Sequence, residues 1–395
     1  MIQVRRRSVW SAALVALVAA TAGGVAWGLS GSPARSAAQA PTPVDYPGLP
    51  HTPVNVSEGG CGAGWSSGRT GLQVFDLRDS STGNADVQLL EPSSGRVVGE
   101  VEGLAAGTSR PLLVRLAAGR YAFRCLLTDT DAVTGPAVPV SGPGSQSEGA
   151  SGTPGVVPVT QQDLIPAAQA YQKWVAAQLP ALLAQVTALQ SDVAAGDLGR
   201  ARADWLTAHL SYERLGAAYG AFGDADAAIN AAGHDGTGFH RLEYGLWHGE
   251  SAASLGAPAA RLVQDVRALQ RSWSAVQFDP QLLGVRAHEI VENTIEFELT
   301  GRTDEGSGSN LRTAQANLEG TAEVLALLRP LLASRLPLGP VDAALSAARA
   351  ELRSLGGVPL SQVTRAQREL LNARFGALVE ELAPVAAVCD ERRTS

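Results

Sequence analysis

The chain has 395 residues, of which 45% are hydrophobic and 17% charged, and it carries a formal net charge of −7. That length accommodates two or three domains with cores of their own. The first forty residues hold four arginines and no acid, so the rest of the chain has a net charge of −11. Because nucleic-acid binding needs a basic face, this acidity argues against a nucleic-acid-binding protein and suits one that handles cations.

Residues 1–40 have the pattern of a secretory signal peptide or an uncleaved N-terminal membrane anchor. Three arginines at 5–7 precede an apolar run over 9–29. A run of about twenty apolar residues is long enough to cross a bilayer. The Ala-Gln-Ala sequence at 38–40 suits a cleavage site, although Pro41 disfavours cleavage there. We therefore expect an extracytoplasmic protein, in the periplasm or at the cell surface, that is either secreted or membrane-anchored.

Residues 41–140 have the pattern of an all-β domain. The segment PLLVRLAAGRYAFRC, residues 111–125, contains two runs of alternating apolar and polar residues separated by Ala-Gly. Short strands about ten residues apart predict a small β-sandwich. The apolar residues of each run should share one face of its strand: Leu112, Val114 and Leu116 in the first, and Tyr121, Phe123 and Cys125 in the second.

Residues 141–160 are rich in Gly, Ser and Pro and are expected to be a linker. Residues 161–390 have the pattern of a helical bundle. In YQKWVAAQLPALLAQVTALQSDVAAGD the apolar residues recur at the period of a helix that ends at Gly196. Long helices with short connections predict antiparallel packing. Further helices are predicted at roughly 197–220, 239–249, 256–275, 281–300, 309–333, 338–355 and 362–388.

Five of the six histidines lie between residues 209 and 288, and three of them have an acid close by on a predicted helix. His240 and Glu243 are three apart in GFHRLEYGLWHG, and His209 and Glu213 are four apart. Residues at these spacings share a helix face and can point at one spot. Metal sites in the cores of helical bundles are built in this way. The spacing therefore indicates a candidate metal site.

The segment HEIVENTIEFE, residues 288–298, adds a stripe of acids at i, i+3 and i+7: Glu289, Glu292 and Glu296. Such stripes are usually solvated helix faces, and a single His-x-x-Glu pair often arises by chance. Glu292 nevertheless lies among apolar residues, which favours a functional acid. HEIVE also resembles the zinc-protease motif His-Glu-x-x-His, but Glu292 stands where the second histidine should be, so the motif is incomplete.

Three segments of the helical region carry a family resemblance: YERLGAAYGAFGDADAAIN (212–230), GTGFHRLEYGLW (236–247) and the stretch over 287–332 that begins AHEIVENTIEFELTG. They resemble, in order, the imelysin-like domain of EfeO-type components of bacterial Efe iron uptake systems. GGCGAGW and GRYAFRCLL in residues 50–140 resemble the cupredoxin-like domain that precedes it in such proteins. The resemblance therefore implies a multidomain protein, with an all-β cupredoxin-like sandwich followed by an all-α imelysin-like helical bundle.

The resemblance also implies a metal site. The family's His-x-x-Glu signature falls on His240 and Glu243. One departure is Gly216, which stands where the family usually has a second glutamate, so the site here has one carboxylate fewer or is altered. The other acids that the resemblance assigns to the site fall on Glu213, Asp224 and Asp226, and on Glu289 or Glu292.

The β domain lacks the residues of a blue-copper centre, which needs two histidines and a cysteine, usually with an axial methionine. Its only histidine is His51, and the only methionine of the chain is Met1. Two interpretations of Cys61 and Cys125 stay open: a structural disulfide, or a second metal site that an acid such as Asp86 completes. Thiols outside the cytoplasm tend to pair, which favours the disulfide. Cys389 is the odd cysteine of the three.

With the resemblance, these residues predict a binding protein rather than an enzyme. It would capture iron, as Fe²⁺ or Fe³⁺, and deliver it to an inner-membrane iron permease, with a haem peroxidase of the dye-decolourising type as a further partner. Only the resemblance selects iron, since one imidazole with several carboxylates also suits other ions, and Zn or Cu are alternative cargoes. The main alternative is an imelysin-like metallopeptidase or hydrolase that uses the same site. A third interpretation is an envelope scaffold with solvated acids.

Overall fold

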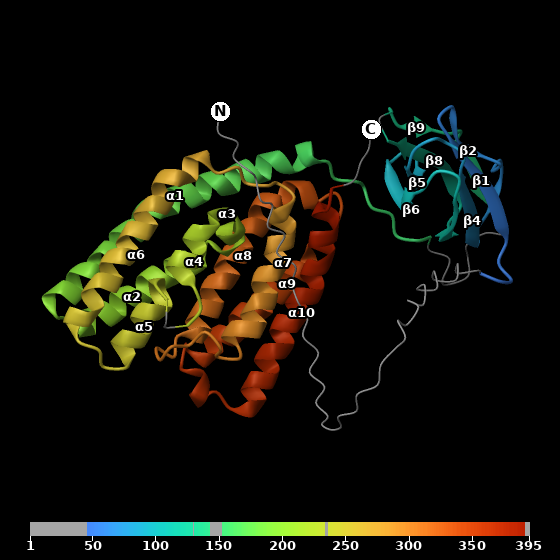
Figure 1. The fold of residues 1–395 in the computed structure, drawn as a ribbon. Coiled ribbons are helices and arrows are strands. Elements are labelled where there is room, and N and C mark those ends of the chain that lie inside the picture. The colour runs from blue at the N-terminus through green and yellow to red at the C-terminus, as the bar shows by residue number, and fades with distance from the viewer. Residues whose placement is uncertain (1–45, 129, 143–151, 234–235, 392–395) are drawn as a thin grey trace, which may run out of the picture. The chain divides into compact units, whose positions relative to one another are not determined.

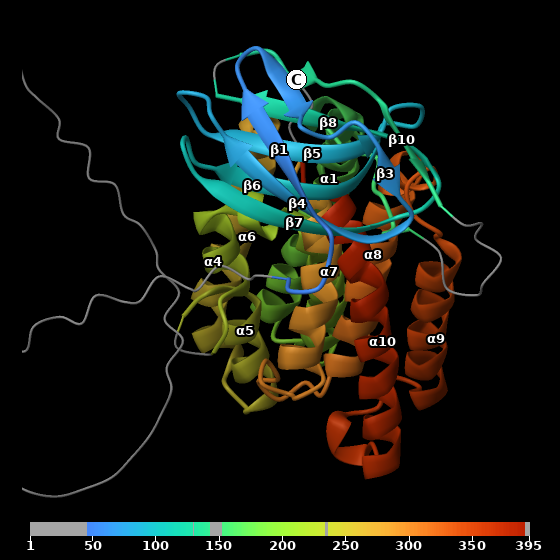
Figure 2. The ribbon, with the colours of Figure 1, turned by 90° about the vertical axis from the view of Figure 1, so that its right-hand side faces the viewer.

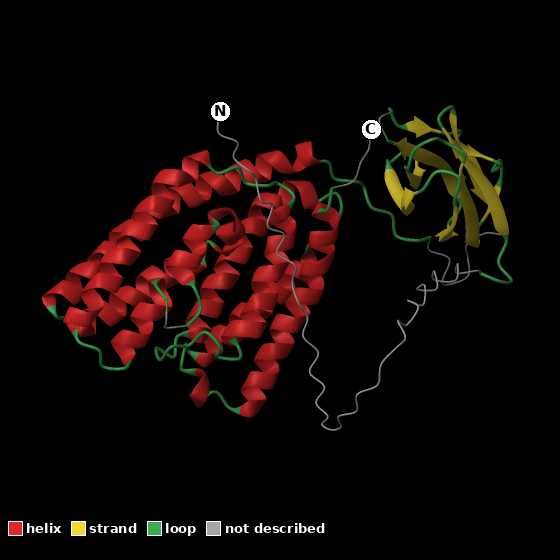
Figure 3. Ribbon diagram, in the orientation of Figure 1, coloured by secondary structure: helices red, strands yellow, loops and turns green. Residues whose placement is uncertain are grey.

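The computed structural model describes residues 46–128, 130–142, 152–233 and 236–391. Strands occupy the first part of this chain and helices the second (Figure 1, Figure 3). The expected signal peptide or anchor, residues 1–40, lies outside the described residues. None of the described helices is both long enough and apolar enough to cross a membrane.

The β region contains two sheets. The first has the strand order β2-β1-β4-β7, and the second has the order β3-β10-β8-β5-β6, with β9 paired to β8. In the first sheet β1 runs parallel to β4, and the other pairs are antiparallel. The strands are β1 (His51–Ser57), β2 (Gly60–Ala63), β3 (Gly68–Arg69), β4 (Gly71–Asp79), β5 (Ala85–Glu91), β6 (Arg96–Leu104), β7 (Ser109–Leu116), β8 (Gly119–Leu127), β9 (Val133–Thr134) and β10 (Val138–Ser141).

Alternating apolar residues of the two sheets pack into one core. Trp65, Phe75 and Phe123 meet edge to face there, with ring centroids 4.9 to 5.5 Å apart. The inward-facing residues predicted for the strands over 111–125 are all buried, as the period-two pattern requires: Leu112, Val114, Leu116, Tyr121, Phe123 and Cys125. The packed sheets agree with the expected two-layered sandwich, and the cupredoxin-like class stays a prediction.

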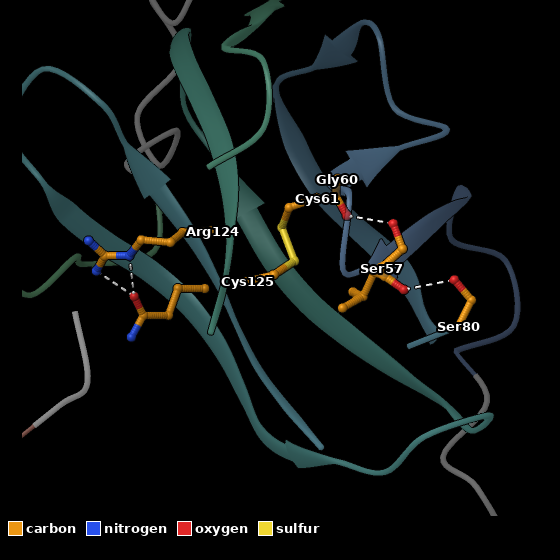
Figure 4. The surroundings of a disulfide bond; sticks show 8 residues. Ser57, Gly60, Cys61, Ser80, Arg124 and Cys125 are labelled. Carbon is orange, nitrogen blue, oxygen red and sulfur yellow. Dashed lines mark hydrogen bonds between the residues drawn. A yellow bond between two sulfur atoms is a disulfide. The ribbon is translucent and has the colours of Figure 1, made fainter. Parts of the chain in front are cut away.

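Cys61 and Cys125 form a disulfide that joins β2 to β8 across the core (Figure 4). Both residues are buried. Val87 stands opposite Cys125 in the sheet, so Asp86, the preceding residue, points to the other face. There Asp86 accepts a hydrogen bond from the Gly103 backbone N–H at 2.9 Å. Of the two arrangements left open by the sequence, the structure contains the disulfide.

The helical region begins at a capping box, in which Thr160 caps α1 and Asp163 bonds back to the backbone of Thr160. α1 ends at Gly196 in the left-handed conformation, as predicted. The main helices are α1 (Gln161–Ala195), α2 (Leu198–Glu213), α4 (Asp224–Asn230), α5 (Gly238–Trp247), α6 (Ala252–Ser272), α7 (Leu282–Asn293), α8 (Asn310–Leu332), α9 (Gly339–Leu355) and α10 (Arg365–Cys389). Short turns are η1 (Gly216–Ala218), α3 (Tyr219–Phe222), η2 (Trp273–Ala275), η3 (Thr294–Glu298) and η4 (Leu360–Gln362).

The helices share one apolar core, in which large aromatic side chains such as Trp205, Tyr212 and Phe375 are fully buried. α1 packs on α2 and α6 (Figure 1), and α10 packs on α7 and α9 (Figure 2). α2 contacts α5 and α8, α4 contacts α5, and η3 contacts α8. These contacts bring the ends of several helices together around the candidate site described below.

Cys389, the last residue of α10, packs against α7. A Cβ added at Gly284 would collide with the Cys389 side chain, so these helices approach closely only because Gly284 lacks one. The thiol is fully buried, and burial raises its pKa to about 11. A protonated and inaccessible thiol is chemically inert.

We expect the native protein to show no reactive thiol, because Cys389 is buried and protonated while Cys61 and Cys125 are bonded to each other. Ellman's reagent should titrate about one thiol per chain after unfolding in guanidinium without reductant. Unfolding after reduction is the control, and it should release all three cysteines. More than one thiol in the unreduced, unfolded chain would contradict the disulfide.

Candidate metal centre

The helix that carries the His-x-x-Glu pair is placed by a glycine and a tryptophan. Gly238 begins α5 with φ of +81°, and a Cβ there would collide with the carbonyl of Ile229 in α4. Only glycine adopts this conformation without strain and allows the close approach. Trp205 in α2 then donates from its indole N–H to the carbonyl of Phe239 at 2.9 Å. These two contacts fix the first turn of α5 and therefore the position of His240.

His240 and Glu243 are both buried, with 4% and 2% of their surface exposed. Nδ1 of His240 lies 3.2 Å from Oε2 of Glu243. The other oxygen of Glu243 accepts hydrogen bonds from Ser307, from the backbone N–H at 3.1 Å and from the hydroxyl at 2.5 Å. Glu243 thus holds the imidazole in place and leaves Nε2 for a ligand, as carboxylates do behind metal-binding histidines.

Burial alone would raise the pKa of Glu243. The hydrogen bonds from His240 and Ser307, with the charges of His209 and His240, outweigh burial and lower the pKa below its ordinary value. Glu243 is therefore ionised at neutral pH although it is buried. Its charge can stabilise positive charge on or beyond the imidazole of His240.

A second imidazole–carboxylate pair lies beside the first. Nε2 of His209 is 3.2 Å from Oε1 of Glu213, and the ring of His209 meets that of His240 edge to face at 5.6 Å. Neither nitrogen of His209 makes a hydrogen bond with the described residues. Glu213 also accepts from Nδ2 of Asn230 at 2.8 Å, and from Asn317 at 3.2 Å in the amide orientation that satisfies Asn317.

Burial would lower the pKa of His209, but contact with Glu213 and the charges of Glu243 and Glu298 raise it overall. Burial would raise the pKa of Glu213, but His209, Asn230 and the charge of His240 lower it overall. Each partner therefore favours the charged form of the other. A buried ion pair of this kind is tolerated when each partner faces the other closely.

A cavity of about 510 Å³ opens among these helices. Glu213 and His240 line it, as does Gly216, which contributes no carboxylate. A Cβ at Gly216 would lie 3.2 Å from Ile290, so this wall is apolar. Glu298, which the sequence did not single out, lines the cavity too. Burial first, and then the charge of Glu213, raise the pKa of Glu298.

Only some of the other predicted acids line the cavity. Asp226 lines the cavity and accepts from the hydroxyl of Tyr212 at 2.6 Å, but Asp224 is exposed at the start of α4 and does not line it. Glu289 lines the cavity with an oxygen 2.5 Å from Nη1 of Arg286. Glu292 is exposed and lies 3.3 Å from Nδ1 of His288. The structure thus gathers part of the predicted set and leaves Asp224 and Glu292 outside.

Within the described residues, no three His, Cys, Asp or Glu side chains are spaced to hold one metal ion. The side chains that line the cavity are therefore candidate ligands around an open space rather than a closed coordination sphere. Several residues that orient them come from segments without a metal-site pattern, such as Ser307, Asn230 and Asn317. Only their position in the folded chain reveals them.

Residues 167–385, more than half of the chain, match the sequence family described as imelysin. The chain belongs to the imelysin family. It is also 27% identical over 356 residues to the "Iron uptake system component EfeO" of Escherichia coli strain K12, covering 86% of this chain and 92% of the relative. The proteins of the same name from Shigella flexneri and Shigella sonnei match equally. The resemblance to EfeO-type components is therefore confirmed.

The electrostatics of this imelysin site predict a stability profile in acid. The pKa of Glu213 lies below its ordinary value of 4.5, so its ionisation stabilises the folded state above that pH and the stabilisation is lost as pH falls through the folded pKa. Glu213→Gln should lower the free energy of unfolding at about pH 6, and its difference from wild type should shrink below about pH 4.5. Urea unfolding of chelator-treated protein over this pH range measures the difference in free energy of unfolding between the two proteins.

Glu296→Gln, which removes an exposed carboxylate from η3, controls for the change of net charge in that series. If the free energy of unfolding varies with pH in parallel for wild type and Glu213→Gln, the charges of the His209–Glu213 pair do not contribute to stability.

Proposed function

We propose that this imelysin is an extracytoplasmic binding component of an iron uptake system, which takes up iron as cargo in the cavity between α2, α5 and η3. The observation that carries the proposal is the buried His240, which lines the cavity while Glu243 holds its Nδ1. Such a carboxylate-backed imidazole is the usual form of a metal-binding histidine. Glu213 on the neighbouring wall supplies a carboxylate oxygen.

The chemistry of these ligands suits a borderline or hard cation. Imidazole binds Fe, Zn and Cu, and carboxylates favour harder ions, so a mixed set is compatible with Fe²⁺ or Fe³⁺. The choice of iron is supported by the relatives, which carry the name of an iron uptake component. Delivery to an inner-membrane permease, and a haem peroxidase as partner, belong to the same proposal.

Capture and release explain the open arrangement better than catalysis does. A hydrolytic zinc site holds its metal on three protein ligands and keeps one position for water, and the zinc-protease motif that would supply two of them is incomplete here. Glu292, where a zinc protease would have its second histidine, is exposed and lies away from the cavity. An ion that is carried as cargo must also be released. A site whose side chains close only around the bound ion allows that release.

His240→Ala tests the proposal, with His248→Ala as the matched control. His248 is exposed at the end of the same helix and does not line the cavity. In anaerobic calorimetry, wild type and His248→Ala should bind about one Fe²⁺ per chain, and His240→Ala should bind at least about tenfold more weakly. Parallel titrations with Fe³⁺, Zn²⁺ and Cu²⁺ give the selectivity.

Equal binding by His240→Ala and wild type would refute a cargo site at this histidine. Cleavage of a peptide library by the iron- or zinc-loaded wild type, lost in His240→Ala, would favour the metallopeptidase alternative instead. If the wild type binds none of the four ions, the proposed function is wrong and the buried pairs are structural.

A further inference from the structure

We propose that Glu298 is a third cargo ligand of this cavity, brought there by the π-helical turn η3. The inference rests on the proposed function, because it assigns a new ligand to the same site. Its support is independent of the His-x-x-Glu signature, since it comes from the backbone of η3 and from the hydrogen bonds around Glu298.

The turn η3 changes which residues face the cavity. Backbone bonds from Leu299 N–H to the Thr294 carbonyl, and from Arg302 N–H to the Phe297 carbonyl, span five residues instead of four. In an unbroken α-helix Glu289 and Glu298 would be nine residues apart and point to opposite sides, about 180° from each other. One extra residue in the turn brings Glu298 to within about 80° of Glu289, on the cavity side.

Glu298 is held in place by neutral donors. The hydroxyl of Thr303 donates to Oε1 at 2.6 Å, and Nδ2 of Asn310 donates to Oε2 at 2.9 Å. A carboxylate has about four acceptor positions, so each oxygen keeps one for another partner. Glu298 is only 8% exposed and lines the cavity. The side chain is therefore oriented in advance and has acceptor capacity left.

The charge of Glu298 has no Arg or Lys partner among the described residues, in contrast to that of its neighbour. Glu289 contacts Arg286, whereas Glu298 forms no ion pair with Arg or Lys among the residues that the structure describes. Glu213 faces the same cavity. A buried carboxylate is costly unless a cation lies close to it, and two acids that face one cavity increase that cost. A bound cation would remove it.

An unsatisfied polar group points the same way. Oδ1 of Asn230, a residue of the cavity wall, is buried without a hydrogen-bond donor among the described residues. Native proteins rarely leave buried polar atoms unpaired. An amide oxygen that lacks a donor is suited to a cation that keeps part of its water.

Glu298→Gln tests the inference, because it removes the charge and keeps the size of the side chain. The control is Glu296→Gln, two residues earlier in η3, where Glu296 is exposed and paired with Arg302 at 3.0 Å. The probe is Fe²⁺ in anaerobic calorimetry on the full chain. Glu298→Gln should weaken binding by about tenfold or more, and Glu296→Gln should stay within about twofold of wild type.

Thermal unfolding separates loss of a ligand from loss of structure. Without metal, Glu298→Gln should melt at or above the wild-type temperature, because a neutral amide replaces an uncompensated buried charge. With Fe²⁺ added, the rise in melting temperature seen for wild type and Glu296→Gln should be reduced in Glu298→Gln. A lower melting temperature without metal would assign Glu298 a structural role and overturn the inference.

The outcomes also separate this inference from the proposed function. If His240→Ala no longer binds Fe²⁺ and Glu298→Gln binds Fe²⁺ as wild type does, the cavity is a cargo site and Glu298 is not a ligand. If wild type binds no Fe²⁺, both proposals are overturned. If both variants lose Fe²⁺ while Glu296→Gln and His248→Ala retain it, both stand.

Discussion

Burying charge inside a helical core is the constraint on which this site depends. His209, Glu213, His240 and Glu243 are each less than a tenth exposed, and an isolated charge in such surroundings would be strongly unfavourable. Pairing each imidazole with a carboxylate removes most of that cost. Neutral donors from Ser307, Asn230 and Asn317 complete the arrangement. The helices therefore have to converge at one place, where α2, α5 and α8 meet.

Local spacing in the sequence was sufficient to place part of the site. His240 with Glu243 and His209 with Glu213 lie at i+3 and i+4, and a helix brings such residues together whatever surrounds it. The helix positions followed from the 3.6-residue period and from caps such as Gly196. In the β region the period of two predicted the buried faces, because successive residues of a strand alternate.

The remaining parts of the site, and the disulfide, depend on helix register and long-range contacts, which a periodic pattern does not contain. The stripe of Glu289, Glu292 and Glu296 assumed an unbroken helix over 281–300, and η3 changes the register within it. Glu292 also lies on the solvent side in spite of its apolar neighbours. Ser307 reaches Glu243 from 64 residues away, and such contacts exist only in the folded chain. The disulfide likewise needed the strands to be placed before Cys61 and Cys125 could be seen to meet.

The π turn also bears on how this site can change in evolution. The π turn takes up one residue, so a chain with one residue fewer between Glu289 and Glu298 would form a regular helix that still holds the second carboxylate about 80° from the first. A single-codon deletion in η3 can thus leave Glu298 facing the cavity, whereas a regular helix of unchanged length would turn it away by about 100°. Among relatives, the length of this helix and the identity of its glutamates consequently have to be compared together. Alignments that place gaps freely in this stretch will obscure that difference.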